Sequence, residues 1–321
     1  MSEAWIWDQY WHSDRVASCF DGRGATNYGD AVASGWRSFF GSLPEGAAIL
    51  DLCSGNGAVA ILAAEAARDF RIVAVDQADI DPAAHVTRFA DCLAAIRFMG
   101  GVNVEALPFA DASFDVAVSQ YGIEYSDLGR SIPELWRVLR PAGRARLVLH
   151  AAEGEVARWS APHVGDADFL LGEIDLCGKA SLCFAAVAAA ERDPEVDEGK
   201  RRAAEAALAA FADALHQAGR YLPGAADPPM IRHSAATLLD AYRNRGRFER
   251  DQLEAVVDSV RSGIEAHRGR VLALLAAAVT AARAEEIAAG LRARGADAAS
   301  FGLTCPQGLI GHVVELRRPG E

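Results

Sequence analysis

The sequence of 321 residues predicts an α/β fold with a doubly wound, mostly parallel sheet and an all-helical insertion. Apolar runs alternate with helix-forming stretches over residues 47–150, which is typical of a parallel sheet with helices on both faces. Residues 151–296 are instead rich in Ala, Leu, Glu and Arg and contain few strand-forming residues. Two extended runs follow them, at residues 299–305 and 309–316, and are expected to return to the sheet.

The first 46 residues are expected to form an N-terminal helical cap. They hold two aromatic stretches on either side of a Gly-rich loop at residues 20–27. We expect Trp5, Trp36 and Phe39 to pack on the sheet.

Residues 48–57, AILDLCSGNG, form the most informative segment. An apolar run and two glycines precede a helix-forming stretch, a pattern that brings backbone N–H groups close to a polar ligand. Gly55 and Gly57 suit this turn because a side chain there would block close approach or require a positive φ. The same glycines satisfy the loose dinucleotide pattern G-x-G-x-x-G/A. Asp51 argues against that alternative, because an acid repels a pyrophosphate and attracts a cationic ligand.

Asp51, Gly55 and Gly57 fill the motif (D/E)-x-x-x-G-x-G, and here the chain resembles the class I S-adenosylmethionine-dependent methyltransferases. The resemblance continues at residues 71–76, 103–109, 113–119 and 135–143. It implies a seven-stranded sheet with an antiparallel last strand, and S-adenosyl-L-methionine as the cofactor. In this family an acid at the position of Asp76 binds the ribose hydroxyls. The implied cofactor site consists of Asp51, Cys53, Gly55, Gly57, Asp76, Gln77, Asn103, Val104, Ser119 and Tyr28.

The helical block at residues 151–296 falls between the fifth strand and the closing hairpin, and residues 297–321 complete the cofactor domain. Ligands of open α/β sheets bind at the carboxyl ends of the strands, and the block leaves the end of the fifth strand. We therefore expect it to cover the acceptor site. Apolar residues spaced by four and three follow one face over residues 253–278. They predict internal packing or a homodimer contact.

Four residues are candidates for acid–base chemistry. A sulfonium methyl group is already electrophilic, so the enzyme mainly aligns the acceptor with it, and a hydroxyl acceptor also gains from a general base. Tyr121 and Glu124 follow the fourth strand, His150 ends the fifth, and His12 lies in the aromatic N-terminal segment. For His150 a catalytic and a structural role both stay open, whereas a structural role is preferred for His12.

Composition excludes several classes of function. A net charge of −12 provides no basic field for a nucleic acid. The six cysteines lack metal-ligand spacing, so we expect free thiols and no metal. The longest apolar run, residues 272–282, is too short to span a bilayer, and residues 1–4 lack the basic region of a signal peptide. We therefore expect a cytoplasmic protein with no membrane partner.

The resulting hypothesis is a methyltransferase that acts on a small or medium-sized metabolite at oxygen. The oxygen assignment rests on absent motifs, since residues 119–122 read SQYG rather than the (D/N/S)-P-P-(Y/F) of amino-directed enzymes. One alternative is methylation of a peptide or protein carboxylate. The other is a regulatory or assembly protein that binds S-adenosylmethionine without methylating.

Overall fold

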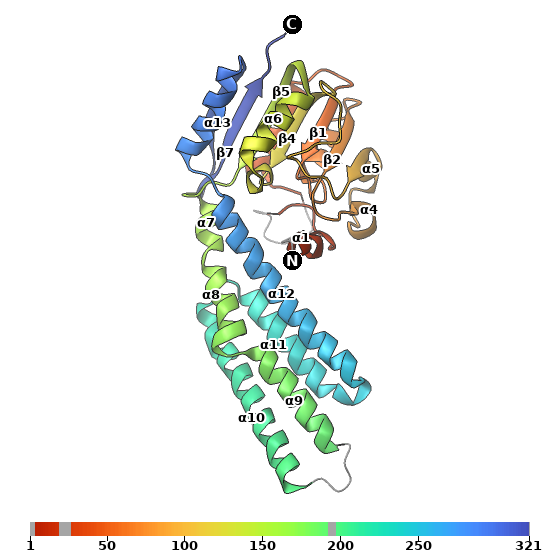
Figure 1. The fold of residues 1–321 in the computed structure, drawn as a ribbon, viewed down its shortest axis with the longest axis vertical. Helices are drawn as coiled ribbons and strands as arrows, with labels where there is room; N and C mark the ends of the chain where they lie inside the picture. Colours follow the sequence, from red (N-terminus) through yellow and green to blue (C-terminus); the bar gives the residue numbers. More distant parts are fainter. Residues whose placement is uncertain (1–3, 19–26, 192–196, 321) are drawn as a thin grey trace. The chain divides into compact units, whose positions relative to one another are not determined.

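The computed structural model describes residues 4–18, 27–191 and 197–320. They belong to two compact units, Met1–Arg158 with Ala273–Glu321, and Trp159–Leu272 (Figure 1). Most of the predicted Gly-rich loop, Cys19 and the predicted helix break at Asp193 and Pro194 lie outside the described residues.

The first unit is built on a seven-stranded sheet with the order β3-β2-β1-β4-β5-β7-β6. Strands β1 to β5 pair in parallel, and β7 runs antiparallel to both of its neighbours. This arrangement confirms the predicted fold class. The strands are β1 (Ala48–Leu52), β2 (Arg71–Val75), β3 (Ile96–Met99), β4 (Phe114–Gln120), β5 (Leu139–Leu149), β6 (Asp297–Cys305) and β7 (Gly308–Arg317).

Helices cover both faces of this sheet, which is why every residue of β1 is buried. One hydrophobic core includes residues of α2 (Asp30–Gly41) and α3 (Ala58–Glu65), and the other includes residues of α6 (Leu128–Val138) and α13 (Ala281–Ala293). Trp36 and Phe39 pack in the first core, as predicted. The prediction for Trp5 is wrong, because α1 (Ala4–Trp11) buries the neighbouring Ile6 and leaves Trp5 exposed. The short helices α4 (Pro82–His85) and α5 (Ala90–Ala94) lie between β2 and β3 in the chain.

Strand β5 begins five residues before the predicted start at residue 144. Phe114 pairs with Leu139 and Val116 with Arg144, so β5 has extra residues at this point. Ala142, with a φ of 60°, lies in this irregular part. A bulge therefore accommodates Pro141 and Gly143, two residues that in the sequence suggest a turn.

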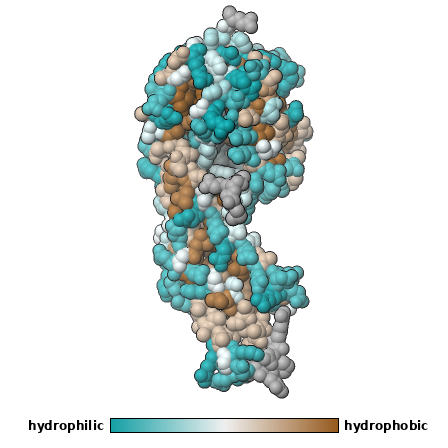
Figure 2. Space-filling view, viewed as in Figure 1, coloured by the Kyte–Doolittle hydropathy of each residue, from teal (hydrophilic) through white to brown (hydrophobic). Residues whose placement is uncertain are grey.

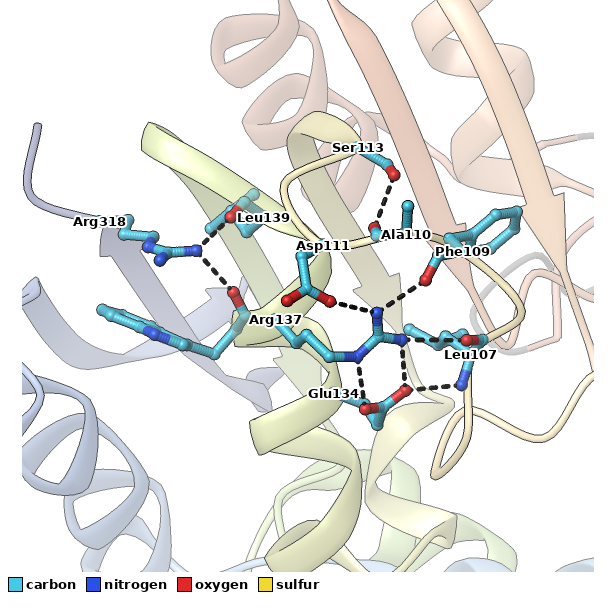
Figure 3. Close-up of polar contacts among 10 residues, drawn as sticks. Leu107, Phe109, Ala110, Asp111, Ser113, Glu134, Arg137, Leu139 and Arg318 are labelled. Atoms are coloured by element: carbon cyan, nitrogen blue, oxygen red, sulfur yellow. Dashed lines mark hydrogen bonds and ion pairs between the residues drawn. The ribbon is translucent and has the colours of Figure 1, made fainter. Parts of the chain in front are cut away.

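Arg137 of α6 holds the segment that precedes β4 (Figure 3). Its guanidinium group donates to the carbonyl oxygens of Leu107 at 3.0 Å and Phe109 at 2.7 Å, and pairs with Glu134. Glu134 in turn accepts a hydrogen bond from the backbone N–H of Leu107 at 2.7 Å. These bonds satisfy backbone N–H and C=O groups of a segment that lies outside the strands. Arg318 fixes the end of α6 through the carbonyl oxygen of Trp136.

The second unit is helical and has a core of its own. Prolines begin α8 and α11 near the predicted breaks. Leu253, Val257 and Ile264 of α12 are buried in this core, so the apolar face of α12 serves internal packing. The helices are α7 (Glu155–Ser160), α8 (Pro162–Asp168), α9 (Leu176–Glu191), α10 (Glu198–Tyr221), α11 (Pro228–Arg243) and α12 (Arg250–Ala277), and the unit boundaries fall within α7 and α12.

This unit is shorter than the insertion expected at residues 151–296, because α13 belongs to the sheet unit. Ala284, Ile287, Ala288 and Leu291 place one apolar face of α13 in the core of the sheet.

Hydrophilic residues cover much of the face shown in Figure 2, with hydrophobic residues scattered between them. Trp159, Leu182 and Phe301 are among the large apolar side chains that are exposed. None of the helices in the described part of the chain is long and apolar enough to cross a membrane.

Candidate functional site

The turn between β1 and α3 has the conformation that its glycines predict. Gly55 and Gly57 have positive φ values of 50° and 84°, and α3 begins at the next residue, Ala58. A Cβ atom at Gly57 would lie 2.7 Å from the ring of Phe98. Cys53 also has a positive φ, 55°, so the chain reverses sharply where β1 ends.

Two buried acids, Asp51 and Asp76, accept backbone hydrogen bonds from the turn and from the helix that follows it. Asp51 is 1% exposed and accepts a hydrogen bond from the backbone N–H of Ala60 at 3.1 Å. Asp76, which directly follows β2, accepts from the N–H groups of Gly55 at 2.8 Å and Ala78 at 2.9 Å. The ends of β1 and β2 are thereby joined through one side chain.

The electrostatics of the turn favour a cationic ligand. Burial, with a further contribution from nearby Asp76, raises the pKa of Asp51 to about 8. Burial also raises the pKa of Asp76. The pKa of the Cys53 thiol is raised well above its usual value by burial and by Asp76, Glu124 and Asp51, so Cys53 stays protonated and is not a nucleophile. A pyrophosphate would add negative charge here, whereas a positive group would relieve the repulsion.

The N-terminal segment covers the glycine turn. The ring of Trp11 lies so close to Gly55 that a Cβ atom there would clash with it. Asn56 fixes this segment, because its Nδ2 donates to the carbonyl oxygens of Trp11 at 2.9 Å, Ser13 at 3.3 Å and Arg15 at 2.7 Å. Sequence reasoning missed Trp11 and Asn56 as site residues, although Asn56 lies between the two glycines.

Beside the turn lies a cavity of about 20 Å³. Its lining includes Tyr28, Asp51, Cys53, Gln120 and Tyr121, so Tyr28 does reach the end of β1. The volume suits a single water molecule and not a nucleoside. The buried acids and the backbone N–H groups of the turn match the chemistry of a positively charged nucleoside, but the cavity beside them is too small to hold one.

The other predicted cofactor residues lie in different settings. Gln77 is exposed beside Asp76. Asn103 is exposed, and its side-chain oxygen accepts from the backbone N–H of Glu105 at 2.8 Å, while Val104 is buried. Ser119 joins β4 to β1 by donating to the carbonyl oxygen of Leu52 at 3.0 Å.

Three of the four candidate catalytic residues come together at the ends of β4 and β5. His150 is 1% exposed, and its Nδ1 lies 2.8 Å from Oε1 of the buried Glu124. The same oxygen accepts the backbone N–H of His150 at 2.8 Å. Tyr121 stacks on the imidazole with ring centroids 4.3 Å apart. When Nδ1 donates to Glu124, the lone pair of His150 resides on Nε2, which is the form that a general base requires.

The hydroxyl group of Tyr121 donates to the carbonyl oxygen of Ile310 at 2.8 Å, which ties it to β7. The backbone of Tyr121 has a φ of 54°, a strained conformation directly after β4. His12 instead contacts the loop after β2, where its Nε2 lies 2.9 Å from the carbonyl oxygen of Asp79 and its ring stacks on His85.

Gln120 is a site residue that sequence reasoning missed. Its Oε1 accepts the indole N–H of Trp36 at 2.7 Å, and the residue lines the small cavity. Its buried Nε2 has no hydrogen-bond partner among the described residues. Its position as the last residue of β4, at the edge of the sheet where ligands bind, could have indicated a role in the site.

Comparisons with known proteins identify methyltransferases as similar to this chain. Residues 49–143 match a family model described as a methyltransferase domain. The chain is 34% identical over 108 residues to a 2-phytyl-1,4-naphtoquinone methyltransferase of Thermosynechococcus vestitus, covering 33% of this chain and 47% of that protein. It is 33% identical over 140 residues to the ubiquinone/menaquinone biosynthesis C-methyltransferase UbiE of Xanthomonas oryzae pv. oryzae, covering 41% and 53%.

A third relative is the malonyl-[acyl-carrier protein] O-methyltransferase of Pseudescherichia vulneris, which is 32% identical over 98 residues. That match covers 30% of this chain and 36% of the relative. The chain thus spans about half the length, or less, of these three curated relatives.

Proposed function

The chain contains a class I S-adenosylmethionine-dependent methyltransferase domain, and from this premise we propose that it methylates a small or medium-sized metabolite at a hydroxyl oxygen. The observation that carries the proposal is the pair of buried acids Asp51 and Asp76 at the ends of β1 and β2. Burial and nearby Asp76 raise the pKa of Asp51, so a cation that binds beside the two acids favours their ionised forms. The sulfonium and ammonium groups of S-adenosylmethionine supply that charge.

Each residue has a distinct role in this proposal. The bound cofactor supplies an electrophilic methyl group. Asp76 accepts hydrogen bonds from the ribose, and Asp51 compensates the positive charge. Trp11 and Tyr28 exclude water once the N-terminal segment has closed. Nε2 of His150, oriented by Glu124, accepts the proton that the acceptor hydroxyl loses.

The proposal also specifies the atom that receives the methyl group, a hydroxyl oxygen. Two of the relatives above are named as a C-methyltransferase and an O-methyltransferase. A hydroxylated acceptor must lose its hydroxyl proton whether its oxygen attacks or a ring carbon activated by that oxygen does. One base therefore serves either reaction. NMR of the product of an acceptor screen is expected to show a methoxy group, and a methyl group on carbon would overturn the oxygen assignment.

Two other functions make different predictions for the same screen. A protein carboxylate methyltransferase would label a peptide or protein and leave small hydroxylated compounds unchanged. A regulatory protein would bind S-adenosylmethionine and release no demethylated product with any acceptor.

Cofactor affinity is expected to rise with pH, by about tenfold per pH unit between about 6.0 and 7.5, and to level off near 8. The unliganded protein holds Asp51 protonated up to about pH 8, because its pKa is raised. Binding of a cation favours the carboxylate, so the ligand has to displace a proton at lower pH. Calorimetric titration in buffers of different ionisation enthalpy measures this proton release directly.

The control for this measurement is Asp51→Asn, which keeps the shape of the side chain and cannot ionise. Its affinity should be weak and independent of pH over the same range. Because the pKa of Asp51 is higher in the folded than in the unfolded protein, the folded state loses stability as pH rises from about 4 to 8. Asp51→Asn removes this loss, so the unliganded variant should also unfold at a higher temperature at pH 7. A pH-independent affinity of the unaltered protein would contradict the assignment.

We also propose that the helical insertion contributes to acceptor recognition, which its connection to the end of β5 supports. Replacing Trp159–Leu272 with a short flexible linker is expected to raise the acceptor KM at least tenfold. Cofactor affinity should stay within about twofold, which shows that the sheet unit is still folded. An unchanged KM would contradict this role, and a homodimer through the insertion stays a prediction.

A further inference from the structure

Three side chains with metal-binding chemistry meet within the helical unit. His163 lies on α8, Asp227 immediately precedes α11, and His267 lies on α12. One ligand atom from each residue lies within 4.8 Å of those of the other two. All three residues are partly buried. The chain thus brings together two imidazoles from α8 and α12 and one carboxylate from the residue before α11.

One buried polar atom of this cluster lacks a hydrogen bond within the described ranges of the chain. Nε2 of His267 is buried and forms no hydrogen bond with any residue that the structure describes. Nε2 of His267 lies 3.4 Å from Oδ2 of Asp227. The His267 ring stacks on the ring of His163, with the two centroids 5.5 Å apart. The other carboxylate oxygen of Asp227 accepts the backbone N–H of Met230 at 3.1 Å. One oxygen of Asp227 therefore faces a buried nitrogen that lacks a hydrogen bond.

The surroundings of His267 favour its neutral form. Burial lowers the pKa of His267, against the opposing effect of Asp227. A neutral imidazole keeps the lone pair that a metal ion needs.

The surrounding residues hold Asp227 in place. Its backbone N–H donates to Oδ2 of Asp166 at 2.6 Å, and the hydroxyl group of Tyr221 donates to Oδ1 of Asp166 at 3.0 Å. Asp166 is 2% exposed. Such outer hydrogen bonds orient the residues that bind a metal.

We propose that His163, Asp227 and His267 bind one divalent transition-metal ion, with Zn²⁺ as the best match. Imidazole and carboxylate ligands suit zinc, whereas Ca²⁺ and Mg²⁺ prefer sites made of oxygen atoms alone. Three protein ligands leave one position of a tetrahedral ion for water or another small ligand. His267 also lines a cavity of about 550 Å³ between residues of α11 and α12.

This site was not expected from the sequence. The expectation of no metal rested on the spacing of the cysteines, and the cluster contains no cysteine. The bound ion would join α8 to the start of α11 and to α12, independently of methyl transfer.

The test is a titration of the 321-residue chain with Zn²⁺ after removal of metals by a chelator. We expect one equivalent to bind, and His163→Ala and His267→Ala each to weaken that binding by about 100-fold. The matched control is His216→Ala, which removes an exposed histidine of α10 in the same unit and should leave the affinity unchanged. Titration with Co²⁺ should add visible absorption bands that both site variants lose.

Thermal unfolding supplies a second measurement. Zn²⁺ should raise the unfolding temperature of the unaltered protein and of His216→Ala, but not that of the two site variants. Far-ultraviolet circular dichroism shows whether each variant is folded, and His163→Ala provides the test if His267→Ala does not fold. Absence of saturable binding to the unaltered protein would overturn the proposal, as would unchanged affinity in a folded site variant.

Discussion

Replacing Asp76 with alanine is expected to weaken S-adenosylmethionine binding by about 100-fold or more. Each carboxylate oxygen of Asp76 already accepts one backbone N–H, from Gly55 or Ala78, and has further capacity for a ribose hydroxyl. Hydrogen bonds to a charged group contribute about 1.5–3 kcal/mol each, so the loss of two corresponds to at least two orders of magnitude. Calorimetric titration with S-adenosylmethionine and its demethylated product measures this loss.

The matched control is Asp79→Ala, which removes an exposed carboxylate from the same loop, with 83% of the side chain accessible. Its affinity for the cofactor should change by less than about threefold, whereas Asp76→Asn should be intermediate because it keeps one acceptor oxygen. Equal affinities of Asp76→Ala and the unaltered protein would remove the ribose role from Asp76. Circular dichroism checks that the glycine turn survives the loss of its acceptor.

The parts of the site that are local in sequence were predictable. A buried strand followed by glycines and a helix-forming stretch leaves the backbone few alternatives, so the turn from Asp51 to Gly57 has the expected conformation. The parallel strands likewise place Asp51 and Asp76 at one edge of the sheet, because neighbouring parallel strands end on the same side. Hydrophobic periodicity and proline positions similarly gave the helical nature of the second unit.

Contacts between distant segments were not predictable in the same way. Nothing in residues 4–18 indicates that Trp11 packs on Gly55, or that Asn56 binds three carbonyl oxygens of that segment. Such contacts depend on side-chain packing over more than 40 residues of chain. The same is true of His163 and His267, which meet only because two helices pack in one particular register.

Two features of the glycine turn are expected to change when the cofactor binds. Asp51 is buried in a protonated form near other acids, which weakens the free protein as pH rises. Trp11 rests on the surface of Gly55 that close approach of a ligand requires. A cationic nucleoside would neutralise the first and displace the second. Cofactor entry and movement of the N-terminal segment are therefore expected to be coupled.

Replacing His150 with alanine is expected to lower kcat by about 100-fold to 10,000-fold with the acceptor found in the product screen. Its imidazole is buried, oriented by Glu124 at 2.8 Å and stacked on Tyr121, so it is a positioned base and not a mobile surface group. The cofactor dissociation constant should change by less than about threefold. That separation of kcat from binding is what a proton-transfer role requires.

Two further variants distinguish this role from a structural one. Glu124→Gln keeps an oxygen that accepts from Nδ1 of His150 and loses only the charge that stabilises the protonated imidazole, so its kcat should lie between those of the unaltered enzyme and His150→Ala. Tyr121→Phe keeps the stacked ring and should remain close to the unaltered kcat. Added imidazole should restore part of the activity of His150→Ala by entering the space that the side chain leaves. Filling the space would also help a structural histidine, so the discriminating result is that rescue by imidazole derivatives of similar size follows their pKa, as proton transfer requires.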